Sequence, residues 1–168
     1  LQSSVITAML QDSRGYLWFG TADGLCRFDS YNFKTFGRVS NSKNSLPGNY
    51  VVKLAEDHDG KIWIGLQKDG VSSYDPATGL FRSYDLSNID STTPLTRSVS
   101  MLFIDKENNV WVGITQKGFI KLDKSTGKCV HYTVNEGLPN NVVYGILPDD
   151  NGNLWMSTNK GLSQFNIK

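Results

Sequence analysis

The side chains in this sequence that could perform acid–base, nucleophilic or metal chemistry are few and lie far apart. The 168 residues include two histidines and two cysteines. His58 falls in a turn-forming segment and His131 in a strand-forming one, so neither is placed to act as a general base in a channel. Cys26 and Cys129 are separated by most of the chain, which is neither a disulfide framework nor a zinc-ligand spacing. We therefore expect no catalytic residue, no metal and no cofactor.

One acidic segment, Asp149-Asp150-Asn151-Gly152-Asn153, superficially resembles a calcium-binding loop. It lacks the distal glutamate that completes such loops. Related segments elsewhere in the chain have the same Asp-x-x-Gly or Asp-x-x-Asn spacing and no more than the same number of acids. Asp bonds to backbone amides two residues on, and Gly or Asn tolerates a left-handed backbone. These segments are therefore predicted to be turns.

Charge and hydropathy exclude two classes of partner. Seventeen basic and 16 acidic residues leave a net charge of +1. This is not the excess of positive charge that nucleic-acid binding requires. No apolar run approaches the roughly 18 residues that a membrane-spanning helix needs, so we expect no membrane contact by this chain. The sequence begins at Leu1 rather than Met, which suggests a part of a longer protein.

Four tryptophans mark an internal repeat. They lie 45, 48 and 44 residues apart, a period typical of repeat architectures. Each has an Asp six residues before it, and a Gly followed by an apolar residue six or seven positions after it. The tryptophans are Trp18, Trp63, Trp111 and Trp155. The shared positions divide the chain into copies at 1–45, 46–93, 94–137 and 138–168, of which the last is truncated.

Each copy is predicted to form four short antiparallel strands. In the second copy, residues 49–56, 61–66, 71–74 and 80–84 favour strands, and Asp, Gly and Pro separate them at turn positions. No segment has sustained helical periodicity. Such small sheets bury both faces by radial stacking, so the expected fold is an all-β partial β-propeller, with a solenoid as the alternative. The tryptophans are expected to pack between adjacent sheets.

The repeated motifs resemble the two-component regulator propeller repeat. Residues 46–51 and 138–142 carry its opening, and residues 17–21 and 24–29 carry its middle. The resemblance implies a periplasmic sensor region of a hybrid two-component histidine kinase and response regulator, as in Bacteroidetes, anchored in the inner membrane. It also implies sensing of glycan fragments that control carbohydrate-use genes. The sequence has no kinase motif, so the kinase activity would belong to the rest of the parent protein.

A ligand is expected at the end of the blades where two sets of loops meet: those before the first strand, and those between the second and third strands. These loops are polar and differ among the copies, which suits a sugar with its many hydroxyl groups, and their lysines suit an acidic sugar. The amides of Asn49 and Asn141 could instead cap the backbone of their own turns. The predicted ligand-binding residues are Asn49, Tyr50, Gln67, Lys68, Arg97, Gln116, Lys117, Asn141, Asn159 and Lys160.

Two other functions stay open. A non-catalytic protein-interaction scaffold would use the same loops to bind a protein. A propeller enzyme similar to the streptogramin lyases would need a general base in the channel, for which the two histidines are poorly placed. Separately, an incomplete ring leaves two apolar sheet faces uncovered. Two expectations follow: either two chains form a homodimer that completes a ring of about eight sheets, or this chain is an excised half of a larger domain.

Overall fold

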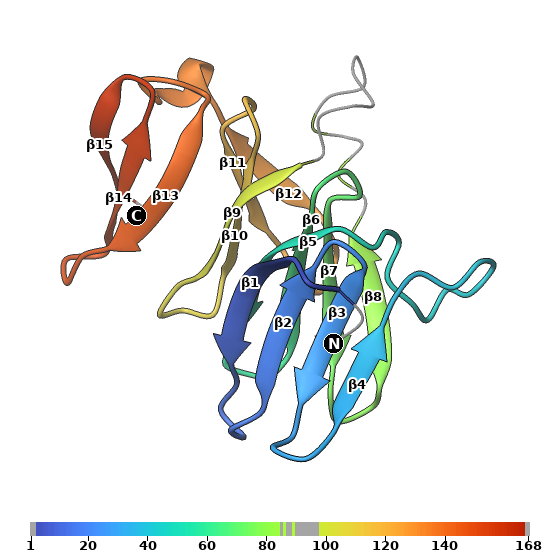
Figure 1. Ribbon diagram of the computed structural model, residues 1–168. Coiled ribbons are helices and arrows are strands. Elements are labelled where there is room, and N and C mark those ends of the chain that lie inside the picture. Colours follow the sequence, from blue (N-terminus) through green and yellow to red (C-terminus); the bar gives the residue numbers. More distant parts are fainter. Residues whose placement is uncertain (1–2, 85, 87–88, 90–97, 167–168) are drawn as a thin grey trace.

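The computed structural model describes residues 3–84, 86, 89 and 98–166. Its strands group into four sheets (Figure 1). The first blade contains β1 (Ile6–Gln11), β2 (Leu17–Thr21), β3 (Gly24–Phe28) and β4 (Phe33–Phe36). The second blade contains β5 (Val51–Glu56), β6 (Ile62–Leu66), β7 (Val71–Asp75) and β8 (Leu80–Tyr84). The third contains β9 (Val99–Ile104), β10 (Val110–Ile114), β11 (Phe119–Leu122) and β12 (Cys129–Tyr132). The fourth contains β13 (Val143–Pro148), β14 (Asn153–Thr158) and β15 (Gly161–Asn166).

Every sheet is an antiparallel meander in which the strands follow one another in chain order. The first strands of consecutive sheets, β1, β5, β9 and β13, contact each other, so they form the inner edge of the assembly. The sheets follow each other in chain order, with the fourth at one end of the row (Figure 1). This arrangement confirms the expected all-β propeller blades. The strands of the second blade lie within two residues of their predicted bounds, whereas the predicted boundary at residue 93 falls outside the described residues.

Helical structure in the described ranges is short. The 3-10 turn η2 (Val134–Glu136) follows β12. It begins with a capping box, in which the Thr133 side chain accepts from the backbone amide of Glu136 and the Glu136 side chain accepts from the backbone amide of Thr133. No helix in this part of the chain has the length and apolar character needed to cross a membrane.

At each of the three junctions between blades, a buried Trp packs against the following blade. Trp18, Trp63 and Trp111 are fully buried, and each packs in a cluster with apolar side chains of the following blade. The predicted role of these tryptophans as packing wedges is confirmed. Trp155, the fourth in the series, is 38% exposed. The tryptophan position is therefore buried by the next blade rather than by its own sheet.

The Asp that precedes each Trp does more than form a turn. One carboxylate oxygen of Asp57 accepts the amides of Asp59 and Lys61, and the other accepts the indole N–H of Trp63 at 2.9 Å. Equivalent Asp–Trp bonds of 2.7 to 3.2 Å occur in the other three blades. Sequence reasoning assigned these acids to the turns alone. The structure shows that they also fix the orientation of the wedge that holds the next blade.

The Gly two residues after the Trp permits close approach of the following blade. A Cβ at Gly20 would lie 2.6 Å from a methyl group of Val51, and one at Gly65 would lie 2.7 Å from a methyl group of Val99. Both valines belong to the first strand of the next blade. A side chain at these two positions would therefore push the inner strands apart.

Candidate ligand face

Hydrogen bonds place the two predicted sets of loops at the same end of the blades. The amide of Gln67 donates to the carbonyl of Tyr50 at 2.9 Å, and the amide of Thr115 donates to that of Ser98 at 2.9 Å. Across the third junction, the amide of Gly118 donates to the carbonyl of Asn141 at 2.7 Å. We call this end the loop face. The Asp-x-x-Gly turns and the turns between third and fourth strands occupy the opposite end, the turn face.

In the second blade, the structure brings together four of the predicted residues. Asn49, Tyr50, Gln67 and Lys68 lie in the two loops that the Gln67–Tyr50 backbone bond joins, and all four are exposed. Tyr50 is 37% exposed, and an exposed aromatic side chain can stack on an apolar face of a ligand. This group therefore combines one aromatic surface with an amide and an ammonium group.

A second group spans the third and fourth blades. Gln116 is exposed and lies at φ 63, Lys117 is half-buried, and the exposed Lys160 donates its amide to Thr158. The side-chain oxygen of Asn159 accepts the hydroxyl proton of Tyr144. Tyr144 is 61% exposed and was missed by sequence reasoning, because its strand position is occupied by Val in the second copy. Arg97, which would lie between the two groups in the chain, is outside the described residues.

Asn49 and Asn141 have a structural role that differs from the caps of their own turns. The Asn49 side-chain oxygen accepts the amide of Arg38 at 2.7 Å, and the Asn141 oxygen accepts that of Val134 at 2.8 Å. Arg38 and Val134 lie just after the outer strand of the preceding blade. Each Asn therefore ties the segment that leaves one blade to the start of the next, and its side-chain oxygen is already engaged.

The predicted residues do not line the grooves at the outer rim. One groove runs between the second and third blades and is lined by residues that include Arg82, Tyr84, Lys128 and His131. His131 also contacts the carbonyl of Lys117 through Nε2. None of the ten predicted residues is among the lining residues of this groove. This groove is therefore separate from the loop face.

The histidines and cysteines belong to no metal-ligand cluster in the part of the chain that the structure describes. His58 is exposed in its turn and donates its amide to Asn108 at 2.9 Å. Cys26 is buried, while Cys129 is half-buried and burial raises the pKa of its thiol. No group of three His, Cys, Asp or Glu in this part could hold a metal ion. At Asp149, hydrogen bonds from the side chain and backbone of Asn153 lower the pKa to about 2.

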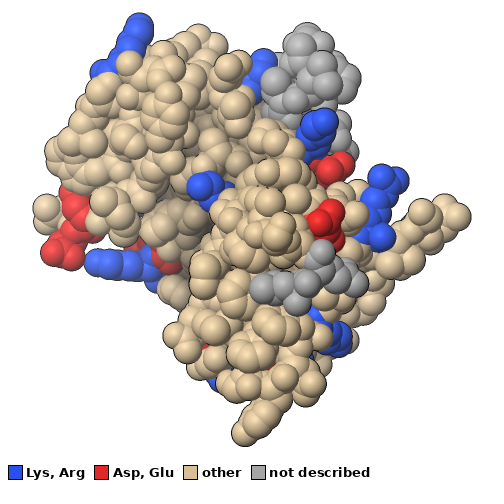
Figure 2. Space-filling model, in the orientation of Figure 1, with Lys and Arg blue, Asp and Glu red and all other residues tan. Residues whose placement is uncertain are grey.

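Charged side chains are scattered over the surface. Figure 2 shows basic and acidic groups standing singly or in small mixed groups around a face that is mostly uncharged. The described part of this face has no basic stripe of the kind that tracks a nucleic-acid backbone.

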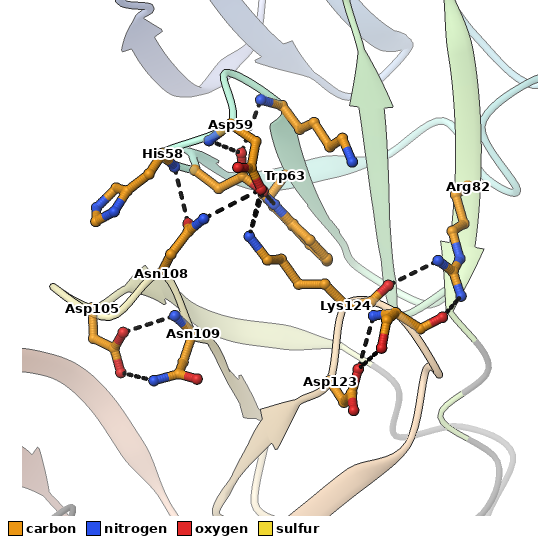
Figure 3. A network of polar contacts seen from close by, with 12 residues as sticks. His58, Asp59, Trp63, Arg82, Asp105, Asn108, Asn109, Asp123 and Lys124 are labelled. Carbon is orange, nitrogen blue, oxygen red and sulfur yellow. Dashed lines mark hydrogen bonds and ion pairs between the residues drawn. The ribbon is translucent and has the colours of Figure 1, made fainter.

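A network of polar contacts links blades two and three on the turn face (Figure 3). Lys124 Nζ lies 3.2 Å from the buried Asp57 carboxylate and 2.9 Å from that of Asp59. Burial opposes the charge on Lys124, but its hydrogen bonds to the two carboxylates outweigh that effect and raise its pKa. The same ammonium group lowers the pKa of Asp59. The Arg82 guanidinium also donates to the carbonyl of Lys124 at 2.8 Å. This network therefore aligns the two blades.

We expect the substitution Lys124→Met to lower the free energy of unfolding by about 1–3 kcal/mol, because it leaves the buried Asp57 carboxylate without its cation. Met keeps the length of the aliphatic stem. Lys106→Met is the matched control, since Lys106 and its partner Asp150 are both exposed, and we expect a change below about 0.5 kcal/mol. Urea unfolding monitored by circular dichroism measures both. Equal effects of the two substitutions would contradict a special role for Lys124.

A family profile matches three segments of the chain. The sequence profile described as two component regulator propeller matches residues 1–23, 45–68 and 137–160. A search of curated proteins finds no match for the chain.

Solved structures agree with the profile. The extracellular domain of the hybrid two-component system BT3049 from B. thetaiotaomicron is 26% identical, with a TM-score of 0.81 over 99% of this chain and 25% of that one. The corresponding domain of BT4673 from the same organism is 27% identical, with a TM-score of 0.78 over 96% of this chain and 24% of that one. The chain thus spans about a quarter of the length of these sensor domains.

More distant structures share the fold alone. A catalytically inactive virginiamycin B lyase from Staphylococcus aureus is 15% identical, with a TM-score of 0.72 over 97% of this chain and 56% of that one. The computationally designed protein Ika4 is 18% identical, with a TM-score of 0.68 over 99% of this chain and 93% of that one. Taken with the four-stranded blades and their Asp–Trp bonds, the profile matches and the two extracellular domains lead to one conclusion: this chain has a propeller fold, and three segments of it match the two-component regulator propeller repeat.

Proposed function

We propose that this chain is part of the periplasmic sensor of a hybrid two-component system, and that its loop face binds an oligosaccharide. The observation that carries the sensor role is the likeness to two extracellular domains of such systems over nearly the whole chain. The parent protein is then an inner-membrane histidine kinase. The chain itself contributes recognition and not catalysis.

The chemistry of the loop face supports a sugar as the ligand. Sugars present an apolar ring face together with hydroxyl groups that donate and accept hydrogen bonds. Tyr50 offers an aromatic surface, and the adjacent Gln67 and Lys68 offer an amide and a cation. Gln116, Lys117, Asn159 and Lys160 supply further donors. The lysines favour an acidic sugar, whose binding would weaken as salt screens the charges.

Two alternatives predict different results. A protein-interaction scaffold would use the loop face without affinity for sugars. A lyase would need a general base beside its substrate. Virginiamycin B lyase has the same fold but only 15% identity, and fold by itself does not establish activity.

We expect an oligosaccharide array, followed by isothermal titration calorimetry, to identify a binding glycan. Tyr50→Ala and the pair Gln67→Ala with Lys68→Ala should each weaken that binding by about tenfold or more, which corresponds to about 1.4 kcal/mol. Lys128→Ala at the outer-rim groove is the control and should leave the affinity unchanged.

Two outcomes would contradict the proposal. If no oligosaccharide binds while a protein partner binds tightly, the scaffold function is correct. If a sugar binds but only Lys128→Ala weakens it, the ligand occupies the outer-rim groove and not the loop face.

A further inference from the structure

The segment that links the first two blades forms a groove on the outer side of the second blade. Residues 37–50 connect β4 with β5, and part of this segment lies beside the outer strand β8. We call the space between them the linker groove, and residues 38–39, 41–43, 45–47 and 81–83 line it. Both of its walls come from this linker and the second blade. The groove is therefore present whatever precedes the first blade or follows the fourth.

Hydrogen bonds fix the shape of the linker groove. The side-chain oxygen of Asn44 accepts the amide of Phe81 at 2.7 Å, which attaches the linker to the outer edge of β8. The hydroxyl of Ser45, a buried residue, accepts the amide of Val39 at 3.2 Å and holds the linker in a compact turn. Because the walls are already in place, a ligand would not have to order them, and this lowers the entropic cost of binding.

The linker groove carries positive charge without a balancing acid. Arg38 and Lys43 line it, both are exposed, and neither forms an ion pair within the described part of the chain. A third cation, Arg82, already donates to the carbonyls of Lys124 and Ser125 at 2.8 Å each. No Asp or Glu is among the described residues that line the groove. Arg38 and Lys43 are therefore the two cations that a ligand in the groove can use.

A hydroxyl group and apolar side chains complete the lining. The Ser42 hydroxyl accepts the amide of Asn44 at 3.2 Å, and the same hydroxyl can donate its own proton to a ligand. Val39, which is 59% exposed, and the half-buried Phe81 add apolar surface. Two cations and a hydroxyl donor favour an oxyanion, and the apolar side chains favour a ring that carries it.

We propose that the linker groove binds a phosphate- or sulfate-type oxyanion through the Arg38 guanidinium, the Lys43 ammonium group and the Ser42 hydroxyl. A guanidinium presents paired N–H groups to two oxygens of such an anion, whereas an ammonium group acts as a point charge. The anion is either a free ion or a substituent of a sugar, whose ring would then contact Val39 and Phe81. This site is distinct from the Tyr50 group on the loop face and does not depend on sugar binding there.

Titration of the 168-residue chain with inorganic phosphate at constant ionic strength, followed by NMR, tests the site. We expect amide shifts confined to the linker and β8, with a dissociation constant of about 1–10 mM, as suits a small ion in an exposed groove. Arg38→Gln and Lys43→Gln each remove one charge and should each weaken binding about fivefold. Both side chains are exposed, so the fold should be unchanged, and circular dichroism checks this. Lys106→Gln, at an exposed lysine on the turn face, is the matched control and should bind phosphate normally.

Glucose 6-phosphate and glucose distinguish the two sources of the anion. Tighter binding of glucose 6-phosphate than of phosphate supports an anion carried by a sugar, whereas equal or weaker binding supports a free ion. In both cases glucose alone should cause no shifts in the linker groove. Glucose that binds there as tightly as glucose 6-phosphate would overturn the proposal, because the groove would then recognise the sugar and not the anion.

Two results with phosphate itself would also overturn the proposal. One is the absence of shifts in the linker groove at about 50 mM phosphate, well above the expected dissociation constant. The other is a loss of affinity in Lys106→Gln as large as in Arg38→Gln, which would indicate general attraction to a basic surface. Phosphate binding should also be unchanged in Tyr50→Ala, so the outcome here is separate from that of the oligosaccharide experiment.

Discussion

Replacement of Trp63 by Ala is expected to lower the free energy of unfolding by about 3–5 kcal/mol, the usual range for loss of a large aromatic side chain from a core. Trp63 is fully buried, and its ring stacks on Tyr84 with the centroids 5.0 Å apart. Its removal opens a cavity in the cluster that joins the second and third blades. It also deprives the buried Asp57 carboxylate of the indole N–H.

Two further variants separate packing from hydrogen bonding at this position. Trp63→Phe keeps an aromatic ring but loses the indole N–H. Its free energy of unfolding should therefore lie between that of the wild type and that of Trp63→Ala. Tyr31→Ala is the control, because Tyr31 is 88% exposed and its removal should change stability by less than about 0.5 kcal/mol. Urea unfolding followed by far-ultraviolet circular dichroism measures all three without relying on tryptophan fluorescence. A cost below about 1 kcal/mol for Trp63→Ala would show that the wedge does not hold the blades together.

Gly118→Ala is expected to lower the free energy of unfolding by about 2–4 kcal/mol. Gly161→Ala, at the same position of the repeat, should lower it by about 1–2 kcal/mol. Both glycines have left-handed backbones, with φ of 77 and 92, so Ala is strained at both. At Gly118 the added Cβ would also collide with the carbonyl oxygen of Tyr132 in β12. At Gly161 it would meet no described atom within 4 Å, because the described fourth blade ends with β15.

The two glycine variants differ in how much unfolding free energy they lose, and this difference measures the clash of the added Cβ with the outer strand β12. Chemical denaturation of the pair, under identical conditions, gives that difference directly. If both variants lose the same stability, backbone strain alone explains the glycine, and the fourth strand does not restrict this position.

Much of the fold follows from local sequence patterns. Alternation of apolar and polar residues, β-branched residues and Asp-x-x-Gly turns act over a few neighbouring residues, so the strands of the second blade could be predicted to within two residues. The period of the tryptophans implied stacked sheets, because a single small sheet cannot bury both of its faces. The positions of the two sets of loops at one end followed from the antiparallel meander.

The candidate site was harder to predict. Ten residues were predicted because their loops were polar and differed among the copies. The structure places four of them, Asn49, Tyr50, Gln67 and Lys68, on one exposed surface. It also shows that the side-chain oxygens of Asn49 and Asn141 bind backbone amides of the preceding blade. Tyr144 was missed because an exposed aromatic residue and a buried one look alike in a strand-forming segment. Its exposure of 61% depends on what lies beside the sheet.

The sequence by itself determined the repeat, the strands, the turns and the choice of Trp as the wedge. Only the tertiary structure decided that the Asp six residues earlier binds the indole, that Lys124 reaches Asp57 from 67 residues away, and that Trp155 is uncovered. The physical reason is the range of the interactions involved. Strand and turn preferences arise between near neighbours in the chain, whereas burial and side-chain pairing depend on how whole sheets are placed against each other. Four nearly identical tryptophan motifs can therefore have different environments, according to which sheets lie beside them in the described structure.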